Sequence, residues 1–489
     1  MSDAKKLSRR EVVVASGAAL LPMGVAREAM AQAPPQQPPP PGVPGRGPGA
    51  PGGAISGMPR PQQSVPLEKT PLFEPEGANK PMGVGKGIYP GRVVWVHNPE
   101  VATWDGKTGE WWDDANTNEG VVERMMSRSL QGMSGKKTDK EAWDALFRHF
   151  NKTRHNTDAG YKPGEKITIK MNCNRDQHPD SGWDHAQVTR KGMASPHVVN
   201  ALIRQLVNVA GIPGEDITLY DVASGRYIGD PIYKRILANP GPTFRDITFM
   251  VNTDKAGNGR VPPVPDMKID PLRWSEPELA KAISPIACVP TVVVEAKYRI
   301  NMCVWRAHDI AAVTLCAKNN FGSIYWPPFD YWGPRPLHSG WIQRTRPMGS
   351  YSVWADITAH NQLGLKNMLY IIDGLYTAQA SELDVSRFVS FGDNWTASLF
   401  MSQDPVAIDS VAVDFLRSEP RQIHVRGSAD NYLHESALIE DPPSKTKYMP
   451  SGVPVKSLGV HEHWNNPVEK KYSRNLGRKE GIELLQLKA

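Results

Sequence analysis

The feature that most constrains the fold is a strand–helix–strand pattern in the middle of the chain. Ile167–Asn174 alternates apolar and polar side chains, as a half-buried strand does. Ser195 and Pro196 are typical of a helix start, and apolar residues then recur at helical spacing as far as Val209. Ile217–Asp221 gives a second strand. Since two strands with a helix between them form a right-handed parallel crossover, the pattern predicts an α/β fold.

The same alternation continues on both sides of this unit. Thr138 and Glu141 form a capping box at the start of one helix. We expect further strands at residues 92–97, 291–295, 368–372 and 399–402, and further helices at 138–150, 308–317 and 406–416. This order predicts an α/β domain over residues 85–420, with a mainly parallel β-sheet and helices on both faces. Residues 421–489 are expected to pack on it as a C-terminal extension.

A stretch rich in Trp, Tyr, Pro and Gly, residues 323–354, interrupts the pattern. It has neither helical nor strand periodicity, so we expect a large aromatic loop insertion. Such a loop can cover a ligand pocket or stack on a sugar or aromatic ligand. The alternative is that it only packs over the sheet.

The N-terminus is predicted to be an export signal rather than part of the fold. Residues 1–33 contain the pair Arg9-Arg10, a mild apolar run and small residues suited to cleavage. The arginine pair resembles a twin-arginine signal, so the partners would include the twin-arginine export machinery and the location would be the periplasm. An amphipathic helix is the alternative, but Pro22 and several Gly argue against it. The Pro- and Gly-rich residues 34–84 are expected to form a linker.

Charge and hydropathy indicate neither a nucleic-acid-binding protein nor an integral membrane protein. The chain has 57 Lys+Arg against 51 Asp+Glu, a formal net charge of +6, and no basic run that would follow a phosphate backbone. It also lacks a stretch of about 18 consecutive apolar residues, so we expect no integral span in the mature chain.

The cysteines are too widely spaced for a metal cluster. They are Cys173, Cys288, Cys303 and Cys316, without a Cys-x-x-Cys pair, so no iron–sulfur cluster is expected. A disulfide between two of the last three is one reading in an oxidising compartment, and small buried side chains are the other.

Polar residues follow several of the expected strands at their carboxyl ends, where α/β sheets bind ligands. They are Lys170, Asn172, Asn174, Asp221, Asp373 and Asp404, with His308 and Asp309 at an expected helix start. Because crowded carboxylates repel one another unless a cation lies among them, the group predicts a divalent metal site. The alternative for Asp309 and Asp404 is a helix N-cap, and for Asp221 and Asp373 a turn. Lys170 would need a partner on a central strand in either case.

A second candidate ligand pair is His461 and His463, separated by Glu462. In an extended segment both imidazoles lie on one side, a spacing that can chelate a transition metal. Two ligands are too few for a site, so we expect a surface His-x-His.

Taken in order, a set of short motifs resembles an uncharacterised family, domain of unknown function 362. The motifs are Ile169-Lys170-Met171-Asn172, Ser195-Pro196-His197, His308-Asp309, Lys318-Asn319-Asn320-Phe321-Gly322, Asp373-Gly374 and Asp404-Pro405-Val406-Ala407-Ile408-Asp409. The similarity covers about residues 90–420. It implies that Lys170, Asn172, His308, Lys318, Asn319, Asp373, Asp404 and Asp409 are family motif positions. Some members carry ferredoxin-like iron–sulfur modules, whose cysteine clusters this chain lacks.

These observations lead to a hypothesis of a periplasmic, metal-assisted enzyme for a small anionic or sugar-like substrate, either a hydrolase or a lyase. The catalytic residues would be Lys170, Asn172, His308, Lys318 and Asn319, and a divalent metal ion would be held by Asp221, Asp373, Asp404 and Asp409. The alternative is a non-catalytic ligand-binding protein that uses the same pocket.

Overall fold

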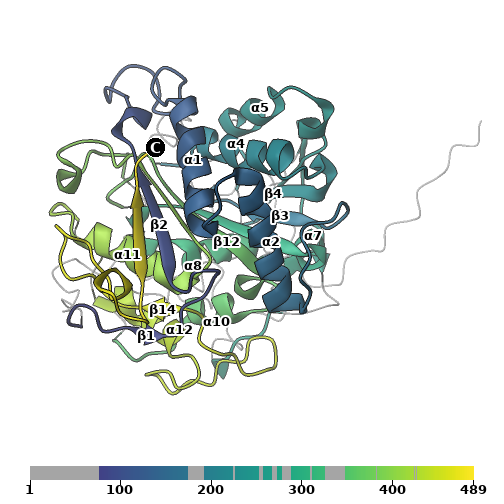
Figure 1. Ribbon diagram of the computed structural model, residues 1–489. Helices are drawn as coiled ribbons and strands as arrows, with labels where there is room; N and C mark the ends of the chain where they lie inside the picture. The colour runs from purple at the N-terminus through teal and green to yellow at the C-terminus, as the bar shows by residue number, and fades with distance from the viewer. Residues whose placement is uncertain are drawn as a thin grey trace, which may run out of the picture. The chain divides into compact units, whose positions relative to one another are not determined.

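The fold is organised around one large β-sheet. A computed structural model describes residues 76–489 except 174–191, 224–225, 253–256, 267–271, 278–287, 309–310, 325–346, 381–382, 423–424 and 426. In this part of the chain nine strands form the sheet (Figure 1). Their spatial order is β15 (Glu483–Leu487), β2 (Arg92–His97), β13 (Ser398–Ser402), β12 (Asn367–Gly374), β9 (Tyr298–Val304), β3 (Ile167–Lys170), β4 (Ile217–Asp221), β5 (Thr248–Val251) and β6 (Arg260–Val261).

The sheet is parallel except at β13. Strands β12, β9, β3, β4, β5 and β6 pair in parallel, and so do β15 and β2. β13 runs antiparallel to both of its neighbours, with Met401 opposite Ile371 on one side and Val94 on the other. The predicted mainly parallel sheet is therefore confirmed. One consequence is that β13 ends at the edge where the other strands begin.

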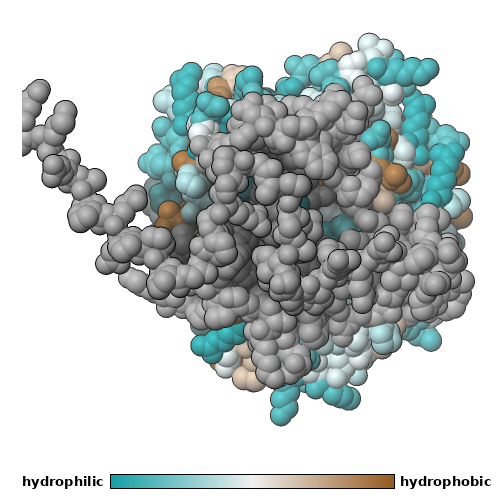
Figure 2. Space-filling model, turned by 180° about the vertical axis from the view of Figure 1, so that it is seen from behind, coloured by the Kyte–Doolittle hydropathy of each residue, from teal (hydrophilic) through white to brown (hydrophobic). Residues whose placement is uncertain are grey.

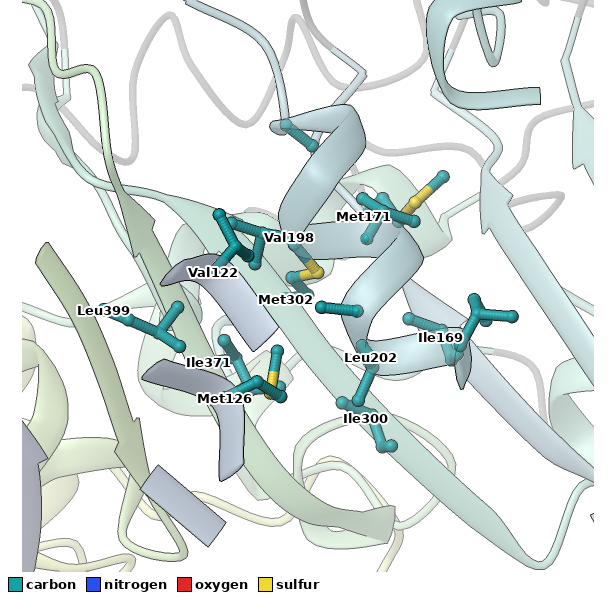
Figure 3. Packing of buried hydrophobic residues seen from close by; sticks show 14 of the residues in the cluster. Val122, Met126, Ile169, Met171, Val198, Leu202, Ile300, Met302, Ile371 and Leu399 are labelled. Atoms are coloured by element: carbon teal, nitrogen blue, oxygen red, sulfur yellow. The ribbon is translucent and has the colours of Figure 1, made fainter. Parts of the chain in front are cut away.

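One face of the sheet is covered by α1 (Glu119–Ser134), α2 (Asp139–His155), α4 (Pro196–Arg204) and α5 (Asp230–Leu237). Figure 3 shows Val122 and Met126 of α1, with Leu202 of α4, among the strand side chains. Ile300 and Ile371 come from neighbouring strands and are fully buried in the same cluster. The apolar stripe of each helix thus packs on the apolar side of the alternating strands.

The opposite face is covered by α8 (Cys316–Asn319), α10 (Val353–Ala359), α11 (Pro405–Arg417) and α12 (Asn431–Ala437). On α11, Phe415 packs edge-on against Trp95 of β2, with ring centroids 4.7 Å apart. Each face therefore has its own hydrophobic core, and the expected helices on both faces are present.

Local helix signals are realised as hydrogen bonds. The Thr138 hydroxyl accepts from the Glu141 amide at 3.3 Å and donates to the Glu141 carboxylate at 2.9 Å. Ser195 accepts from the Val198 amide at 3.5 Å, ahead of Pro196 at the first helical position. Both predicted helix starts are confirmed.

Two sequence predictions are wrong. Thr291–Glu295, expected as a strand, is the short helix α7, which directly follows the strand β8 (Val289–Pro290). Tertiary context overrides the β preference of consecutive valines. The helix expected from His308 is instead a hairpin of β10 (Arg306–His308) and β11 (Ala312–Thr314), and α8 begins only at Cys316.

Short elements complete the described chain. Strand β1 (Met82–Gly83) pairs with β14 (Val460–His461), and β7 (Pro265–Asp266) pairs with β8. A π-helical turn, Gln205–Val209, continues α4. Turns of 3-10 helix lie at Pro99–Val101, Gly214–Asp216, Pro242–Arg245, Asn320–Ser323, Gly364–Lys366, Val389–Phe391, Gly427–Asp430 and Arg474–Leu476.

Both ends of the described chain belong to the fold. Beyond packing on the domain, residues 421–489 supply β15, the edge strand of the main sheet. The last residues of the expected linker include β1, which pairs with β14 near α12 at the bottom of Figure 1. Most of the expected aromatic loop, residues 325–346, lies outside the described residues, while Tyr351 and Trp354 after it are buried.

The described surface is mainly hydrophilic. On the face shown in Figure 2, exposed hydrophobic side chains of the described residues are scattered among hydrophilic ones. No helix in the described part of the chain is both long and apolar enough to cross a membrane.

Candidate functional site

The carboxyl ends of β3 and β4 hold a buried ion pair. The two strands are parallel neighbours, and Lys170 and Asp221 end them. The Lys170 ammonium lies 3.1 Å from the Asp221 carboxylate, and it also donates to the Asn319 side-chain oxygen at 3.1 Å and to the Met171 carbonyl. Lys170 is 1% exposed and Asp221 4%. Burial lowers the pKa of Lys170, while the Asp221 charge opposes that shift.

Asp221 is held by the backbone around it. Its two oxygens accept from the amides of Cys173 at 3.0 Å and Ala223 at 3.1 Å. Gly322 lies directly against the pair: a Cβ there would be 2.3 Å from an Asp221 oxygen and 2.4 Å from the Lys170 nitrogen. Only a glycine therefore fits beside the ion pair.

Asn319 ties the pair to the central strand β9. Its amide group donates to the Asn301 side-chain oxygen at 2.7 Å, to the Met302 carbonyl at 3.1 Å and to the Lys170 carbonyl at 3.3 Å. The structure thus brings three predicted site residues, Lys170, Asp221 and Asn319, into direct contact.

A second buried charge extends this network, and the sequence analysis missed it. The Arg299 guanidinium is fully buried and donates to the Tyr220 hydroxyl at 2.8 Å and the Ser323 hydroxyl at 2.7 Å. It also donates to side-chain oxygens of Asn320 at 2.7 Å and Asn367 at 2.8 Å. The sequence does contain a signal for it: Arg299 is a charged residue within a mainly apolar stretch, residues 298–304, and a buried charge there needs hydrogen-bond partners, as Lys170 does.

The predicted metal ligand Asp373 lies at the same edge but on a distant strand. Between β4 and β12 lie β3 and β9, so roughly 14 Å of sheet separates Asp221 from Asp373 at the usual strand spacing. The Asp373 carboxylate accepts from the amides of Ser195 at 2.6 Å and Leu375 at 3.2 Å. Burial raises its pKa to about 6, and those two hydrogen bonds oppose the shift.

The other two predicted metal ligands serve helix starts. Asp404 follows the antiparallel β13 and so lies at the opposite edge of the sheet, where it caps α11. Its carboxylate accepts from four backbone amides, those of Lys86, Val406, Ala407 and Val460. Asp409 accepts from the amides of Cys316 at 2.9 Å and Ala317 at 3.0 Å. The structure therefore does not gather the four carboxylates into one site.

The remaining predicted residues lie near strand or helix ends. His308 ends β10, and its Nδ1 accepts from the Ala311 amide at 3.2 Å. Asn172, two residues beyond β3, is 8% exposed, and Lys318 is half-buried on α8. Asn174 and Asp309 lie outside the described residues.

The histidine pair is not at the surface as expected. His461 is fully buried, and His463 is 7% exposed. The ligand atoms of Glu76, His434 and His461 all lie within 4.8 Å of one another, an arrangement that could hold a metal ion. The His434 Nε2 is 3.1 Å from the Glu76 carboxylate. Sequence spacing could not reveal this group because its members come from three distant segments.

All four cysteines are buried. The sulfurs of Cys303 on β9 and Cys316 at the start of α8 are 3.6 Å apart. Of the two possibilities that the sequence left open, a disulfide and small buried side chains, the second describes these cysteines.

An open groove lies elsewhere, between α4 and α5. It has a volume of about 650 Å³ and is lined by acidic and basic side chains, among them Asp114, Glu119, Arg204 and Arg235. None of the predicted site residues lines it.

Comparison with known proteins places the chain in a family without giving it an activity. No curated protein matches the sequence. The model of one family, described as a domain of unknown function, DUF362, matches residues 167–414, about half of the chain. This match begins at β3 with Lys170, includes Asn319, Asp373 and Asp404, and ends within α11. The protein therefore belongs to the DUF362 family.

Proposed function

We propose that this protein is an exported enzyme that acts on a small anionic or sugar-like substrate at the carboxyl edge of its sheet. The observation that carries the proposal is the buried pair of Lys170 and Asp221 in contact with Asn319. It lies where α/β sheets bind their ligands, and a buried charge pair contributes little to stability compared with apolar side chains. A functional role explains why it is there.

The geometry supports the following roles for these side chains. Burial makes the Lys170 ammonium easier to deprotonate, and the Asp221 carboxylate, 3.1 Å away, is placed to accept its proton. Lys170 can therefore act as a general acid and base, or bind an anionic group in exchange for the side-chain oxygen of Asn319. Asn319 and Gly322 fix the position of the pair. Asn172, His308 and Lys318 remain predicted catalytic residues.

The metal-assisted part of the hypothesis now rests on different residues. Backbone amides already occupy the carboxylates of Asp373, Asp404 and Asp409. Support for a metal comes instead from Glu76, His434 and His461, on other elements of the fold.

Ligand screening with a matched pair of variants tests the proposal. The protein is screened by thermal shift against phosphate, sulfate, dicarboxylates and sugar acids, and each hit is followed for turnover by mass spectrometry. Lys170→Met/Asp221→Asn removes both charges and should abolish stabilisation and turnover. The control is Lys166→Met/Asp216→Asn, which removes a 2.7 Å pair just before the same two strands, at the opposite edge, and should change neither.

The outcomes separate the two functions. Ligand stabilisation with turnover, lost only in the first variant, supports the enzyme. Stabilisation without turnover supports the alternative, a ligand-binding protein that uses the same site. A hit that binds the first variant as tightly as the unchanged protein contradicts both.

Export is the second part of the proposal, and it depends on the arginine pair. Arg9→Lys/Arg10→Lys keeps the charge but removes the twin-arginine signature, so we expect the protein to accumulate in the cytoplasm. Immunoblots of cell fractions measure this. The control Lys5→Arg/Lys6→Arg should reach the periplasm normally, and export of both variants would argue against this pathway.

A further inference from the structure

The group formed by Glu76, His434 and His461 carries an inference that is independent of the strand-end site. Its members come from the first described residues, from α12 and from β14. Strand β14 pairs with β1, and both contact α12, so these segments lie side by side (Figure 1). The fold thus brings two imidazoles and a carboxylate to one place.

Hydrogen bonds identify which nitrogen of His461 faces the group. The Ser410 hydroxyl donates its single proton to the Val406 carbonyl at 2.7 Å. Ser410 can therefore only accept in its 2.8 Å hydrogen bond with the His461 Nδ1. The proton of this imidazole is on Nδ1, and its Nε2 carries a lone pair.

That Nε2 atom is the critical observation. His461 is fully buried, and among the described residues its Nε2 has no hydrogen-bond partner. Buried polar atoms in proteins are almost always paired, so an acceptor in this position needs an explanation. A proton shared by Glu76 and His434 would satisfy those two side chains but would leave the His461 Nε2 unpaired.

A metal ion would satisfy all three side chains at once. Around tetrahedral Zn²⁺, with bonds of about 2.0–2.1 Å to nitrogen and oxygen, ligand atoms are about 3.3 Å apart. The His434 and Glu76 atoms are already 3.1 Å apart, and every pair in the group is within 4.8 Å. Small side-chain movements would complete the geometry.

The surroundings match those of known metal-binding histidines. Such a histidine donates its other ring N–H to an oxygen that fixes the ring, as His461 does to Ser410. The neighbouring His463 differs from it, because its Nδ1 lies 2.7 Å from the Asp414 carboxylate and its Nε2 lies 4.0 Å from the Asp430 carboxylate. The ring of His463 lies 4.9 Å from that of His461, beside the group.

We propose that Glu76, His434 and His461 bind a divalent transition metal of the zinc type, with Ser410 as a positioning residue for His461. Two imidazoles and a carboxylate favour such a metal over Mg²⁺ or Ca²⁺, which prefer oxygen ligands. The ion connects the start of the folded chain to α12 and β14. The partly exposed Glu76 side chain gives the site its access to solvent.

Metal titration of the full chain tests this site. Apoprotein prepared with a chelator is titrated with Zn²⁺ by calorimetry and with Co²⁺ by visible absorption. We expect one equivalent of each to bind. Glu76→Gln, at a partly exposed residue, and His461→Ala should each lose this binding, and Ser410→Ala should weaken it by about 10- to 100-fold.

Controls separate ligand loss from misfolding. His155→Ala, at the exposed end of α2, should bind zinc as the unchanged protein does. Circular dichroism checks the fold of every variant, and Glu76→Gln keeps the test decisive if His461→Ala does not fold. Failure of the unchanged protein to bind either metal, or full zinc affinity in a folded Glu76→Gln, would overturn the proposal.

Discussion

At the scale of residues, two buried cations, Lys170 and Arg299, are each surrounded by several hydrogen-bond acceptors. Lys170 donates to a carboxylate, a side-chain amide and a carbonyl, and Arg299 donates to hydroxyl and amide oxygens. An unpaired charge in the same place would be far too costly. The interior therefore tolerates these two cations only as members of a network.

Removing one member of the Lys170–Asp221 pair should cost more than removing both. Lys170→Met leaves the Asp221 carboxylate buried without its counter-ion, so we expect the free energy of unfolding to fall by about 3–5 kcal/mol. Lys170→Met/Asp221→Asn should regain most of it. Urea denaturation measures both, and a double variant as unstable as Lys170→Met would contradict the cost assigned to the unpaired Asp221 carboxylate. Lys445→Met, at an exposed pair with Asp441, should cost less than about 1 kcal/mol.

The buried Asp373 should make stability depend on pH. Burial raises its pKa from 3.8 to about 6, so the folded protein binds this proton more tightly than the unfolded chain does. The resulting stabilisation is complete below about pH 4 and is lost as the pH rises through 6. Between pH 4 and 7, the stability of the unchanged protein relative to Asp373→Asn should fall by about 3 kcal/mol. Denaturant titrations across this range measure it, and a constant difference would contradict the raised pKa.

At the scale of elements, the helix caps differ in how far along the chain their hydrogen-bond partners lie. The Thr138 cap of α2 contacts only Glu141, three residues away. The Asp404 cap of α11 also holds the amides of Lys86 and Val460, more than 50 residues away in either direction. The second cap therefore fastens one segment near β1 and another at β14 to α11.

Alanine at the two caps should show this difference. Thr138→Ala removes one local cap and should cost about 1 kcal/mol. Asp404→Ala leaves four backbone amides without their acceptor and should cost about 3 kcal/mol or more. Unfolding free energies from denaturant titration test the comparison, and similar losses would show that Asp404 acts only as a local cap.

At the scale of the whole molecule, the fold extends beyond the family domain. The family match ends at residue 414, but the main sheet needs β15 as its last strand beside β2. Residues 59–489 form one compact unit. The C-terminal residues are therefore part of the sheet's architecture.

Deleting residues 483–489 should destabilise the whole protein. The deletion removes β15, the parallel partner of β2, and so exposes the edge of β2. It also removes the hydrogen bond that the Asn98 side-chain amide donates to the Ala489 carbonyl. We expect a loss of at least about 3 kcal/mol, with aggregation during thermal unfolding. Removing residues 1–33, the expected export signal, is the matched control and should leave the melting temperature unchanged. Equal stability of both truncations would show that β15 is dispensable.

Sequence alone determined what depends on neighbouring residues. Alternation predicted a strand over residues 167–174, which the structure shows as β3 ending at Lys170, and helical spacing predicted the helices after Thr138 and Ser195, because these patterns arise within a few residues. They also placed Lys170 and Asp221 at the ends of adjacent parallel strands. They failed at Thr291–Glu295, where packing overrides local preference.

Only the tertiary structure decided what depends on distant segments. The direction of β13 sends Asp404 to the opposite edge, and strand order separates Asp221 from Asp373. Neither strand direction nor strand order is encoded in a local pattern, because both follow from long-range pairing. The same is true of His461, which the sequence placed at the surface. Long-range packing buries it beside Glu76 and His434, since residues so far apart in the chain meet only when the whole protein folds.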